Sequence, residues 1–237
     1  MVRMKIPDEE RRLFVKRAGA ALVGAALYAP ALAAQSAAPA SKEKAAEEVS
    51  PTEDLMREHG LLNRILLIYD EIERRIDTRK DYDPKIVSAS ANIIRKFIEE
   101  YHEKLEENYL FPRFIKAGRL NDLVQILLIQ HAAGRDVTAR ILHLAEARTP
   151  PQRTRLRDEI HSFVRMYRPH EAREDTVLFP ELHHIVSQHE FDSLGEEFEN
   201  QERKLFGTDG FEKMVSQVEG LEKQLGIFDL AKFTPTS

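Results

Sequence analysis

The segment His102–Pro112 reads HEKLEENYLFP, and the segment His170–Pro180 reads HEAREDTVLFP. Both follow the pattern His-Glu-x-x-Glu-acid-x-x-Leu-Phe-Pro, so the chain contains the same acidic motif twice. In each copy a glutamate stands four residues after the histidine. Residues at that spacing share one face of an α-helix. The repeat therefore predicts two helices that each carry a histidine and a carboxylate on a single face.

The composition favours one all-helical domain with appendages. Of the 237 residues, 42% are hydrophobic and 32% are charged, while glycine is scarce. That profile suits helices with an apolar core face and a charged outer face. The net charge is -5 and there is no long basic run, so we expect no nucleic-acid partner.

The chain has no cysteine, which limits the chemistry that a site can use. Disulfides, thiolate metal ligands, iron–sulfur clusters and a cysteine nucleophile are excluded. Any bound metal must therefore be held by His, Asp, Glu, Tyr or water.

The N-terminal segment has the features of an export signal. Arg11 and Arg12 precede an alanine-rich apolar run over residues 18–33, which ends in the small-residue pattern Ala-Leu-Ala. The run is too short to span a bilayer comfortably, and the arginine pair resembles a twin-arginine (Tat) signal. An ordinary Sec signal or an uncleaved anchor is the alternative. We expect a signal peptide over residues 1–33 and a flexible linker over residues 34–50.

This segment also predicts a location. Cleavage after Ala33 would leave a periplasmic or otherwise extracytoplasmic protein with no membrane attachment. The Tat route carries proteins that are already folded, often with a cofactor loaded, which favours a tightly held metal.

Helix starts are well marked along the rest of the chain. The segment SPTE at residues 50–53 is a capping box with proline at the first helical position, and a similar box begins at Thr149. The predicted helices cover residues 51–77, 84–116, 120–148 and 150–187, followed by shorter ones over 190–205 and 210–225. Four long helices with short connections predict an up-down-up-down bundle over residues 51–188, with a C-terminal helical extension over residues 189–237. Three prolines are expected to kink or end helices: Pro112, Pro169 and Pro180.

Helix register brings four histidines to one layer of this bundle. His102 lies on the same apolar stripe as Ile98 and Leu105. His59 and His102 each lie roughly 27 Å from the turn between the first two helices, so they meet when those helices pack antiparallel. His131 and His170 match in the same way, within about one turn, across the other hairpin.

Imidazoles and carboxylates buried in an apolar core need a compensating charge. Isolated buried ions cost several kcal/mol each, even after relaxation. A cation compensates directly, and this mixture of ligands suits iron, manganese or zinc. The donors exceed what one tetrahedral zinc ion requires. Two metals bridged by Glu106 and Glu174 would use the full set: His59, His102, Glu106, His131, His170 and Glu174.

These motifs, together with Glu58-His59 and Gln130-His131, resemble the hemerythrin-like, HHE cation-binding domain. The resemblance covers residues 51–187, and the tail to about residue 225. Ferritin-like bundles use Glu-x-x-His instead, with the order reversed and a shorter spacing. The resemblance implies a four-helix bundle around a non-heme, carboxylate-bridged di-iron centre, with the six residues above as ligands and with manganese or zinc as other possible metals.

The pattern departs from that of the oxygen-carrying hemerythrins. Those proteins have a second histidine four residues after the one on the third helix, where this chain has Arg135. They also use an aspartate at the spacing of Asp175. The bridging carboxylate is therefore Glu174, which mirrors Glu106, or else Asp175 or Glu103.

Other polar residues near the motifs have simpler expected roles. Glu103, Glu107 and Glu171 are expected to be solvated or to support the ligands, and Tyr101, Tyr109 and Tyr167 to pack, with a hydrogen bond to a ligand as the alternative for the tyrosines. Because one histidine is missing, Glu103, Glu171, a tyrosine or water is the alternative source of a further metal ligand. The Leu-Phe pairs at residues 110–111 and 178–179 should fill the core beside the metal layer. The remaining histidines are expected at the surface or in loops: His143, His161, His183, His184 and His189.

The functional hypothesis is an exported di-iron protein that binds O₂ or a related small molecule such as NO or peroxide. The alternatives are a di-iron enzyme (a peroxidase, an oxidase or an NO-consuming protein) and periplasmic iron storage or delivery. A missing histidine leaves room for an open coordination position, which turnover requires. The redox partner is not indicated by the sequence, and the two C-terminal helices either cover the bundle or mediate self-association.

Overall fold

Residues 49–235 are the part of the chain that the computed structural model describes. The predicted signal peptide and all but the last two residues of the predicted linker lie outside this range. Within it, the chain is helical and contains no strand.

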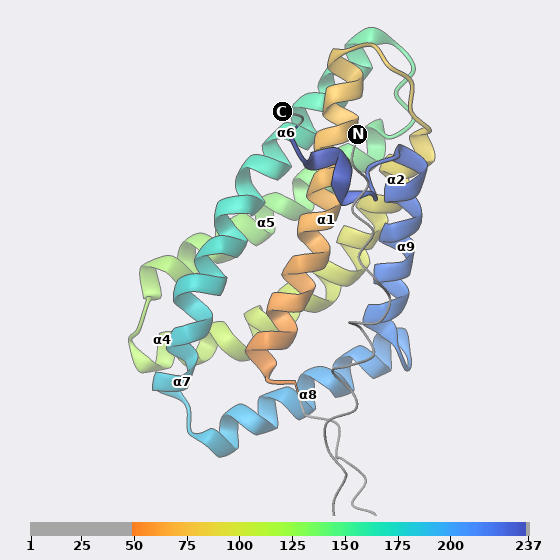
Figure 1. The fold of residues 1–237 in the computed structure, drawn as a ribbon. Coiled ribbons are helices and arrows are strands. Elements are labelled where there is room, and N and C mark those ends of the chain that lie inside the picture. Colours follow the sequence, from red (N-terminus) through yellow and green to blue (C-terminus); the bar gives the residue numbers. More distant parts are fainter. Residues whose placement is uncertain (1–48, 236–237) are drawn as a thin grey trace, which may run out of the picture. The chain divides into compact units, whose positions relative to one another are not determined.

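Four helical rods form the bundle, and their directions alternate along the chain (Figure 1). The first rod is α1 (Pro51–Asp77). The second joins α2 (Pro84–Ile93), η1 (Ile94–His102), α3 (Glu103–Leu105), η2 (Glu106–Leu110) and α4 (Phe111–Ala117). The third is α5 (Asn121–Leu144), and the fourth joins α6 (Pro150–Arg173), η3 (Glu174–Leu178) and α7 (Phe179–Ile185). Because α1 packs on α6, α6 on α5, and α5 on α2, the four rods enclose a common core. The predicted up-down-up-down fold is confirmed.

The rods begin where the sequence places capping residues. The Ser50 hydroxyl accepts a hydrogen bond from the Glu53 backbone N–H at 3.2 Å. The Asp83 carboxylate accepts one from the Lys85 N–H at 2.9 Å. These bonds satisfy backbone donors that a helix start leaves unpaired. The second rod ends at Gly118, whose φ of 66° is the left-handed conformation that glycine adopts at helix ends.

Two π-helical segments lie next to prolines that were expected to kink or end their helices. The segments η2 and η3 immediately precede α4 and α7, which carry Pro112 and Pro180 in their first turns. Pro169 lies inside α6, which continues to Arg173. Proline lacks an N–H and crowds the carbonyl one turn earlier, and a wider π turn relaxes that conflict. These two segments start at the paired glutamates, Glu106 and Glu174, and a third π segment, η1, runs from Ile94 to His102.

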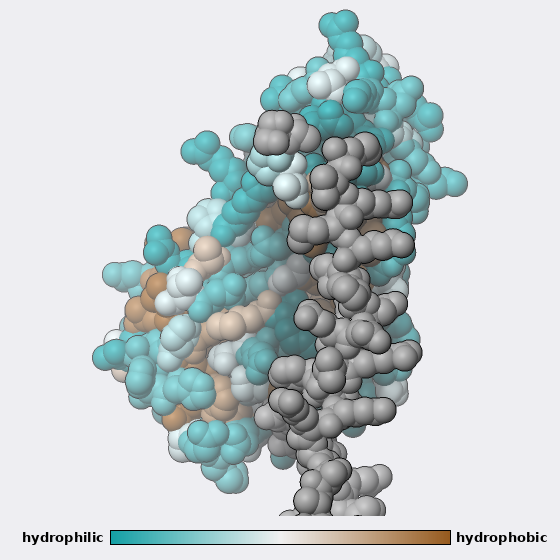
Figure 2. Space-filling model, in the orientation of Figure 1, coloured by the Kyte–Doolittle hydropathy of each residue, from teal (hydrophilic) through white to brown (hydrophobic). Residues whose placement is uncertain are grey.

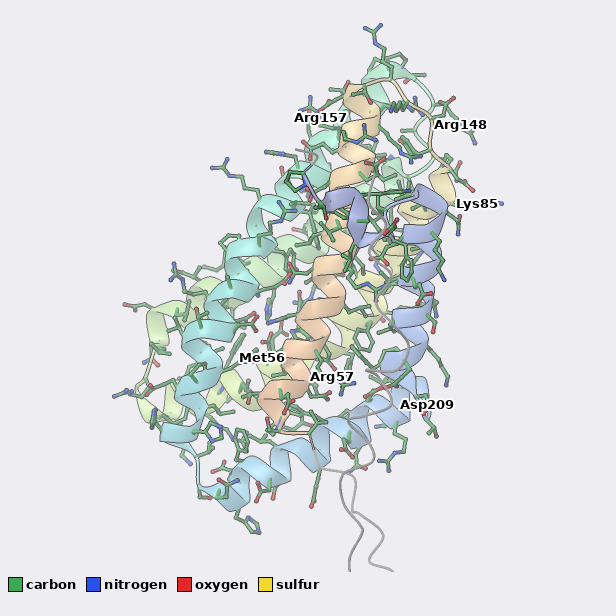
Figure 3. The ribbon with its side chains drawn as sticks, in the orientation of Figure 1. Met56, Arg57, Lys85, Arg148, Arg157 and Asp209 are labelled. Atoms are coloured by element: carbon green, nitrogen blue, oxygen red, sulfur yellow. The ribbon has the colours of Figure 1, made fainter. Side chains whose placement is uncertain are left out.

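The C-terminal helices cover the bundle. The helix α8 (Gln188–Phe206) packs on α1, and α9 (Gly210–Leu225) packs on α1 and α2; a short 3₁₀ turn, η4 (Leu230–Phe233), follows. Arg64 on α1 pairs with Glu222 on α9 through a bond from Nε to Oε1 at 3.0 Å. Arg57, labelled in Figure 3, lies over the Phe211 ring at 4.6 Å. Of the two expected roles for this extension, the structure shows coverage of the bundle.

The core runs through the bundle, and most of the large apolar side chains are buried in it. Leu61, Leu62 and Ile65 of the run LLNRILLI are at most 2% exposed, as expected for a core segment. The face drawn in Figure 2 is mainly hydrophilic, with smaller hydrophobic patches. None of the helices between residues 49 and 235 has both the length and the apolar character required to cross a membrane.

Candidate metal centre

All six side chains predicted as ligands meet in the interior of the bundle. Each of the four rods contributes one histidine, and the second and fourth rods also contribute a glutamate. The exposure of every member is 4% or less: His59, His102, Glu106, His131, His170 and Glu174. The five remaining histidines are exposed, as expected.

The histidines form two pairs. The Nε2 atoms of His59 and His102 are 3.0 Å apart, and those of His131 and His170 are 3.2 Å apart. The Nδ1 atoms of three of these rings lie beside carboxylates, which accept but do not donate hydrogen bonds when ionised. A neutral ring that donates through Nδ1 carries a lone pair on Nε2. When both rings of a pair are neutral and donate through Nδ1, the facing Nε2 atoms present lone pairs to each other, an arrangement that a cation between them would stabilise.

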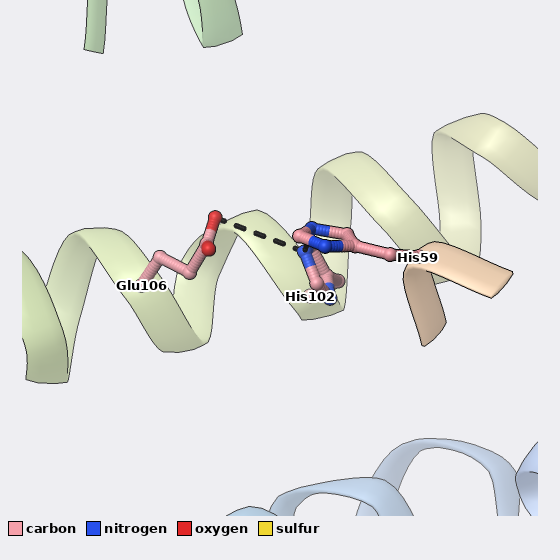
Figure 4. A group of neighbouring side chains, drawn as sticks. All are labelled: His59, His102 and Glu106. Carbon is pink, nitrogen blue, oxygen red and sulfur yellow. Dashed lines mark hydrogen bonds and ion pairs between the residues drawn. The ribbon is translucent and has the colours of Figure 1, made fainter. Parts of the chain in front are cut away.

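Each glutamate spans both histidine pairs. Glu106 Oε2 lies 3.8 Å from His102 Nε2 and 3.4 Å from His131 Nε2. Glu174 Oε2 lies 3.4 Å from His59 Nε2 and 3.1 Å from His170 Nε2. Figure 4 shows one half of the cluster, with Glu106 beside the rings of His59 and His102. The donors are thus arranged as two histidine pairs linked by two carboxylates.

Without a cation, the cluster contains buried carboxyl oxygens that no neighbouring group in residues 49–235 stabilises by a hydrogen bond. Both carboxyl oxygens of Glu106 and of Glu174 are buried and lack a hydrogen-bond partner among the described residues. Burial raises the pKa of Glu106 well above its usual range, and the adjacent Glu174 raises it further. Burial also opposes ionisation of Glu174, but His170 and His59 hold the pKa of this carboxyl below its usual range. Two divalent cations would supply the missing positive charge, so the donor set fits metal ions.

A hydrogen-bond acceptor orients each imidazole from outside the cluster. The distance from Nδ1 to the acceptor oxygen is 2.7 Å for His59, 2.6 Å for His102, 3.1 Å for His131 and 2.9 Å for His170. The acceptors are, in the same order, Asp175, Glu58, Glu107 and Gln130. Such partners fix the ring orientation and raise the basicity of a histidine ligand.

Three carboxylates were considered as the bridge between the histidine pairs, and of these Glu174 is the one that lies between them. Asp175 instead contacts His59 Nδ1, on the outer side of the ring. Both oxygens of Glu103 are engaged elsewhere, because Oε1 accepts from the Tyr167 hydroxyl at 2.7 Å and Oε2 accepts from Arg135 at 2.6 Å. Burial raises the pKa of Glu103 to about 8.

The phenylalanine of each Leu-Phe pair packs against the cluster, as expected. Phe179 stacks on His59 with ring centroids 5.5 Å apart, and Phe111 stacks on His131 at the same 5.5 Å. Tyr167 packs on Phe163, as expected, and also donates the hydrogen bond to Glu103.

Sequence reasoning missed the roles of Glu58, Gln130 and Asn63. Glu58 and Gln130 each precede a histidine of the cluster, and this matched spacing was the available signal. Asn63 donates to Glu171 and to the backbone carbonyl of His59. The spacing shows that these residues repeat, but only the packing of the rods shows which histidine each one contacts.

Comparison with known proteins agrees with the geometry. The family model described as the hemerythrin HHE cation binding domain matches residues 50–182. The uncharacterized proteins Rv1995 of Mycobacterium tuberculosis and Mb2018 of Mycobacterium bovis are each 47% identical to the chain over 191 residues, covering 79% of it and 75% of their own length. No solved structure matches the chain. With its helical bundle and its His/Glu clusters, the chain belongs to the hemerythrin HHE cation-binding family.

Proposed function

We propose that this chain is an exported non-heme di-iron protein that binds O₂ or a related small molecule such as NO or peroxide. The observation that carries the proposal is the pair of buried glutamates that each lie beside both histidine pairs and whose carboxyl oxygens make no hydrogen bond within residues 49–235. Buried carboxylates without partners are costly in the protein alone, and metal ions remove that cost.

In this proposal His59 and His102 would hold one ion, and His131 and His170 would hold the other. Glu106 and Glu174, which each lie beside both histidine pairs, would complete the ligand set. Bound iron would supply a redox-active Lewis acid for a small ligand, and manganese or zinc is compatible with the same donors. The chain itself orients the four rings, excludes bulk water and keeps aromatic rings against the cluster.

Elemental analysis of the purified protein tests this function. We expect two iron ions per chain, and loss of most of this iron in His102→Ala. His161→Ala is the matched control, because His161 is exposed on α6 and outside the cluster. Visible spectra with and without O₂, NO or peroxide then show whether a small ligand reaches the iron. Equal metal contents in wild type and His102→Ala would contradict the assignment of the site.

Turnover is the second candidate, and Arg135 is the observation that favours it. Arg135 stands where the oxygen carriers have a further histidine, and its guanidinium is bonded to Glu103 and Glu107. A chain with fewer histidine donors leaves a coordination position open for a reacting molecule. Consumption of H₂O₂ or NO by the iron-loaded protein, abolished in Glu106→Ala, would support an enzyme; stoichiometric binding without consumption would support a carrier or sensor.

Iron storage or delivery is the weaker alternative, because six donor side chains hold few ions. Metal analysis that finds many ions per chain would reverse this order.

Export is supported by the sequence of residues 1–33 alone. Replacing Arg11 and Arg12 by lysine should retain the protein in the cytoplasm, as measured by cell fractionation of the tagged full-length chain. Unchanged export of this variant would argue for the Sec route instead.

A further inference from the structure

The internal repeat of this chain includes the residues that orient the histidines. Glu58 and Gln130 precede His59 and His131 at matching positions of α1 and α5. Each of them crosses to the neighbouring rod, where Glu58 accepts from His102 and Gln130 accepts from His170. The same contact is therefore made twice, once for each histidine pair.

The two copies of this contact differ in charge. The Glu58 carboxyl is 1% exposed and its Oε2 lies 2.6 Å from His102 Nδ1. Gln130 offers a neutral amide oxygen to His170 Nδ1 at 2.9 Å. A hydrogen bond to a carboxylate is shorter and stronger than one to a neutral amide, and a cation held by His102 favours the carboxylate form of Glu58 over its acid form. The hydrogen bond to a carboxylate also makes the imidazole a better electron donor through Nε2, so His102 should be the stronger ligand of the two.

The remaining outer contacts differ in the same direction. Asp175 orients His59, and Glu107 orients His131, from matching positions of the two repeated motifs. Glu107 is also bonded to Arg135 and to Lys104, whose positive charges offset its own. Among residues 49–235, Asp175 has no ion pair with lysine or arginine.

The residue that matches Arg135 on the first rod differs too. At that place α1 carries the neutral Asn63, which donates to Glu171 as Arg135 donates to Glu103. These three differences leave more carboxyl groups without a lysine or arginine partner around the pair His59–His102 than around the pair His131–His170 among the described residues.

We propose that the two metal positions are unequal, that the His59–His102 position binds its divalent cation first and more tightly, and that Glu58 is the positioning residue responsible for most of the difference. The proposal rests on the proposed function only in that the cluster binds divalent cations. It does not depend on iron, on O₂ or on turnover.

A reciprocal exchange of Glu58 and Gln130 tests the proposal. Glu58→Gln and Gln130→Glu keep an acceptor oxygen and nearly the same shape, so each changes the charge behind one histidine. The metal-free full-length chain is titrated with Zn²⁺ against a chromophoric chelator of known affinity. We expect wild type to bind Zn²⁺ in two resolved steps. Glu58→Gln should weaken the first step by about 10- to 100-fold, and Gln130→Glu should strengthen the second by a similar factor.

Two further variants assign the steps to the histidine pairs. His59→Ala should remove the tight step, and His131→Ala should remove the weak one. Glu219→Gln, on the exposed face of α9, is a control for the loss of one charge, and far-UV circular dichroism verifies that each variant is folded.

The outcomes separate the inference from the function on which it rests. Binding of both ions in one step of equal affinity, or an unchanged first step in Glu58→Gln, would overturn the inference alone. Loss of the tight step in His131→Ala rather than His59→Ala would also overturn it. Failure of the wild-type chain to bind Zn²⁺ would overturn the proposed function together with the inference.

Discussion

Gly134 leaves no room for even a single methyl group, because the buried Tyr167 side chain lies against it. It lies in the middle of α5, and a Cβ built on it would be 2.0 Å from the Tyr167 hydroxyl oxygen and 2.8 Å from the ring atom that carries it. The absence of a side chain therefore lets Tyr167 reach Glu103. Gly134→Ala should force Tyr167 to move and should lower the free energy of unfolding by about 1–3 kcal/mol, as overpacking typically does. Thermal or urea unfolding of the metal-free protein measures the change.

Gly220→Ala is the matched control for this substitution. Gly220 also lies inside a helix, α9, and a Cβ built on it meets nothing within 4 Å. Alanine there should raise the stability by roughly 0.5–1 kcal/mol, because it limits the unfolded chain more than glycine does. If both variants changed stability in the same direction and by the same amount, the contact with Tyr167 would not be the cause.

At the same scale, some site residues are readable from the sequence and others are not. His102 and Glu106 were predicted because their spacing on one helix face is a property of the chain alone. Glu58 was not predicted to contact His102, because that contact joins two rods and depends on their separation and rotation. Likewise, Asp175 stands next to Glu174 in the sequence, yet in the structure it faces the outer side of His59.

At the scale of elements, a partly buried ion pair helps to attach α9 to the bundle. Glu222 is 7% exposed and Arg64 is 29% exposed in the side chain, and both nitrogens of the guanidinium edge reach the carboxylate. Glu222→Ala should leave Arg64 without its partner beneath α9 and should cost about 1–3 kcal/mol of stability. In this variant, backbone hydrogen exchange should also speed up more in α9 than in α5, relative to wild type.

Glu219→Ala is the control on the same helix. Its pair with Lys223 is exposed, at 36% and 56%. Exposed pairs contribute about 0–1 kcal/mol, so this change should leave both stability and exchange close to wild type. A similar loss in both variants would mean that general helix propensity, and not the contact with α1, explains the effect.

The elements also show where sequence prediction stops. The predicted helix over residues 210–225 and the helix α9 coincide, because caps and apolar periodicity are local signals. The π segments were not predicted. Whether a helix meets Pro112 by ending or by widening depends on what the surrounding rods allow, since the packed core holds the rod in place on both sides.

At the scale of the whole molecule, the bundle encloses more carboxyl groups than apolar packing alone explains. Besides Glu106 and Glu174, the buried set includes Glu58, Glu103 and Glu171, each at most 2% exposed. Burial raises the pKa of Glu58 and of Glu171 to about 8. A metal-free chain therefore folds around groups that lose their charge, whereas a metal-loaded chain can keep the central carboxylates ionised.

This difference predicts that metal stabilises the whole bundle through Glu106. A ligand that binds only the folded chain adds about 2.7 kcal/mol when its free concentration is 100 times Kd. Metal-free wild type and Glu106→Gln should unfold at similar temperatures, because the buried carboxyl already resembles a neutral amide. Added Zn²⁺ or Fe²⁺ should raise the Tm of wild type and should raise that of Glu106→Gln much less, as measured by calorimetry. Glu99→Gln replaces another buried glutamate of the second rod outside the cluster and should keep the full rise. Equal metal-dependent rises in wild type and Glu106→Gln would show that the cations bind elsewhere.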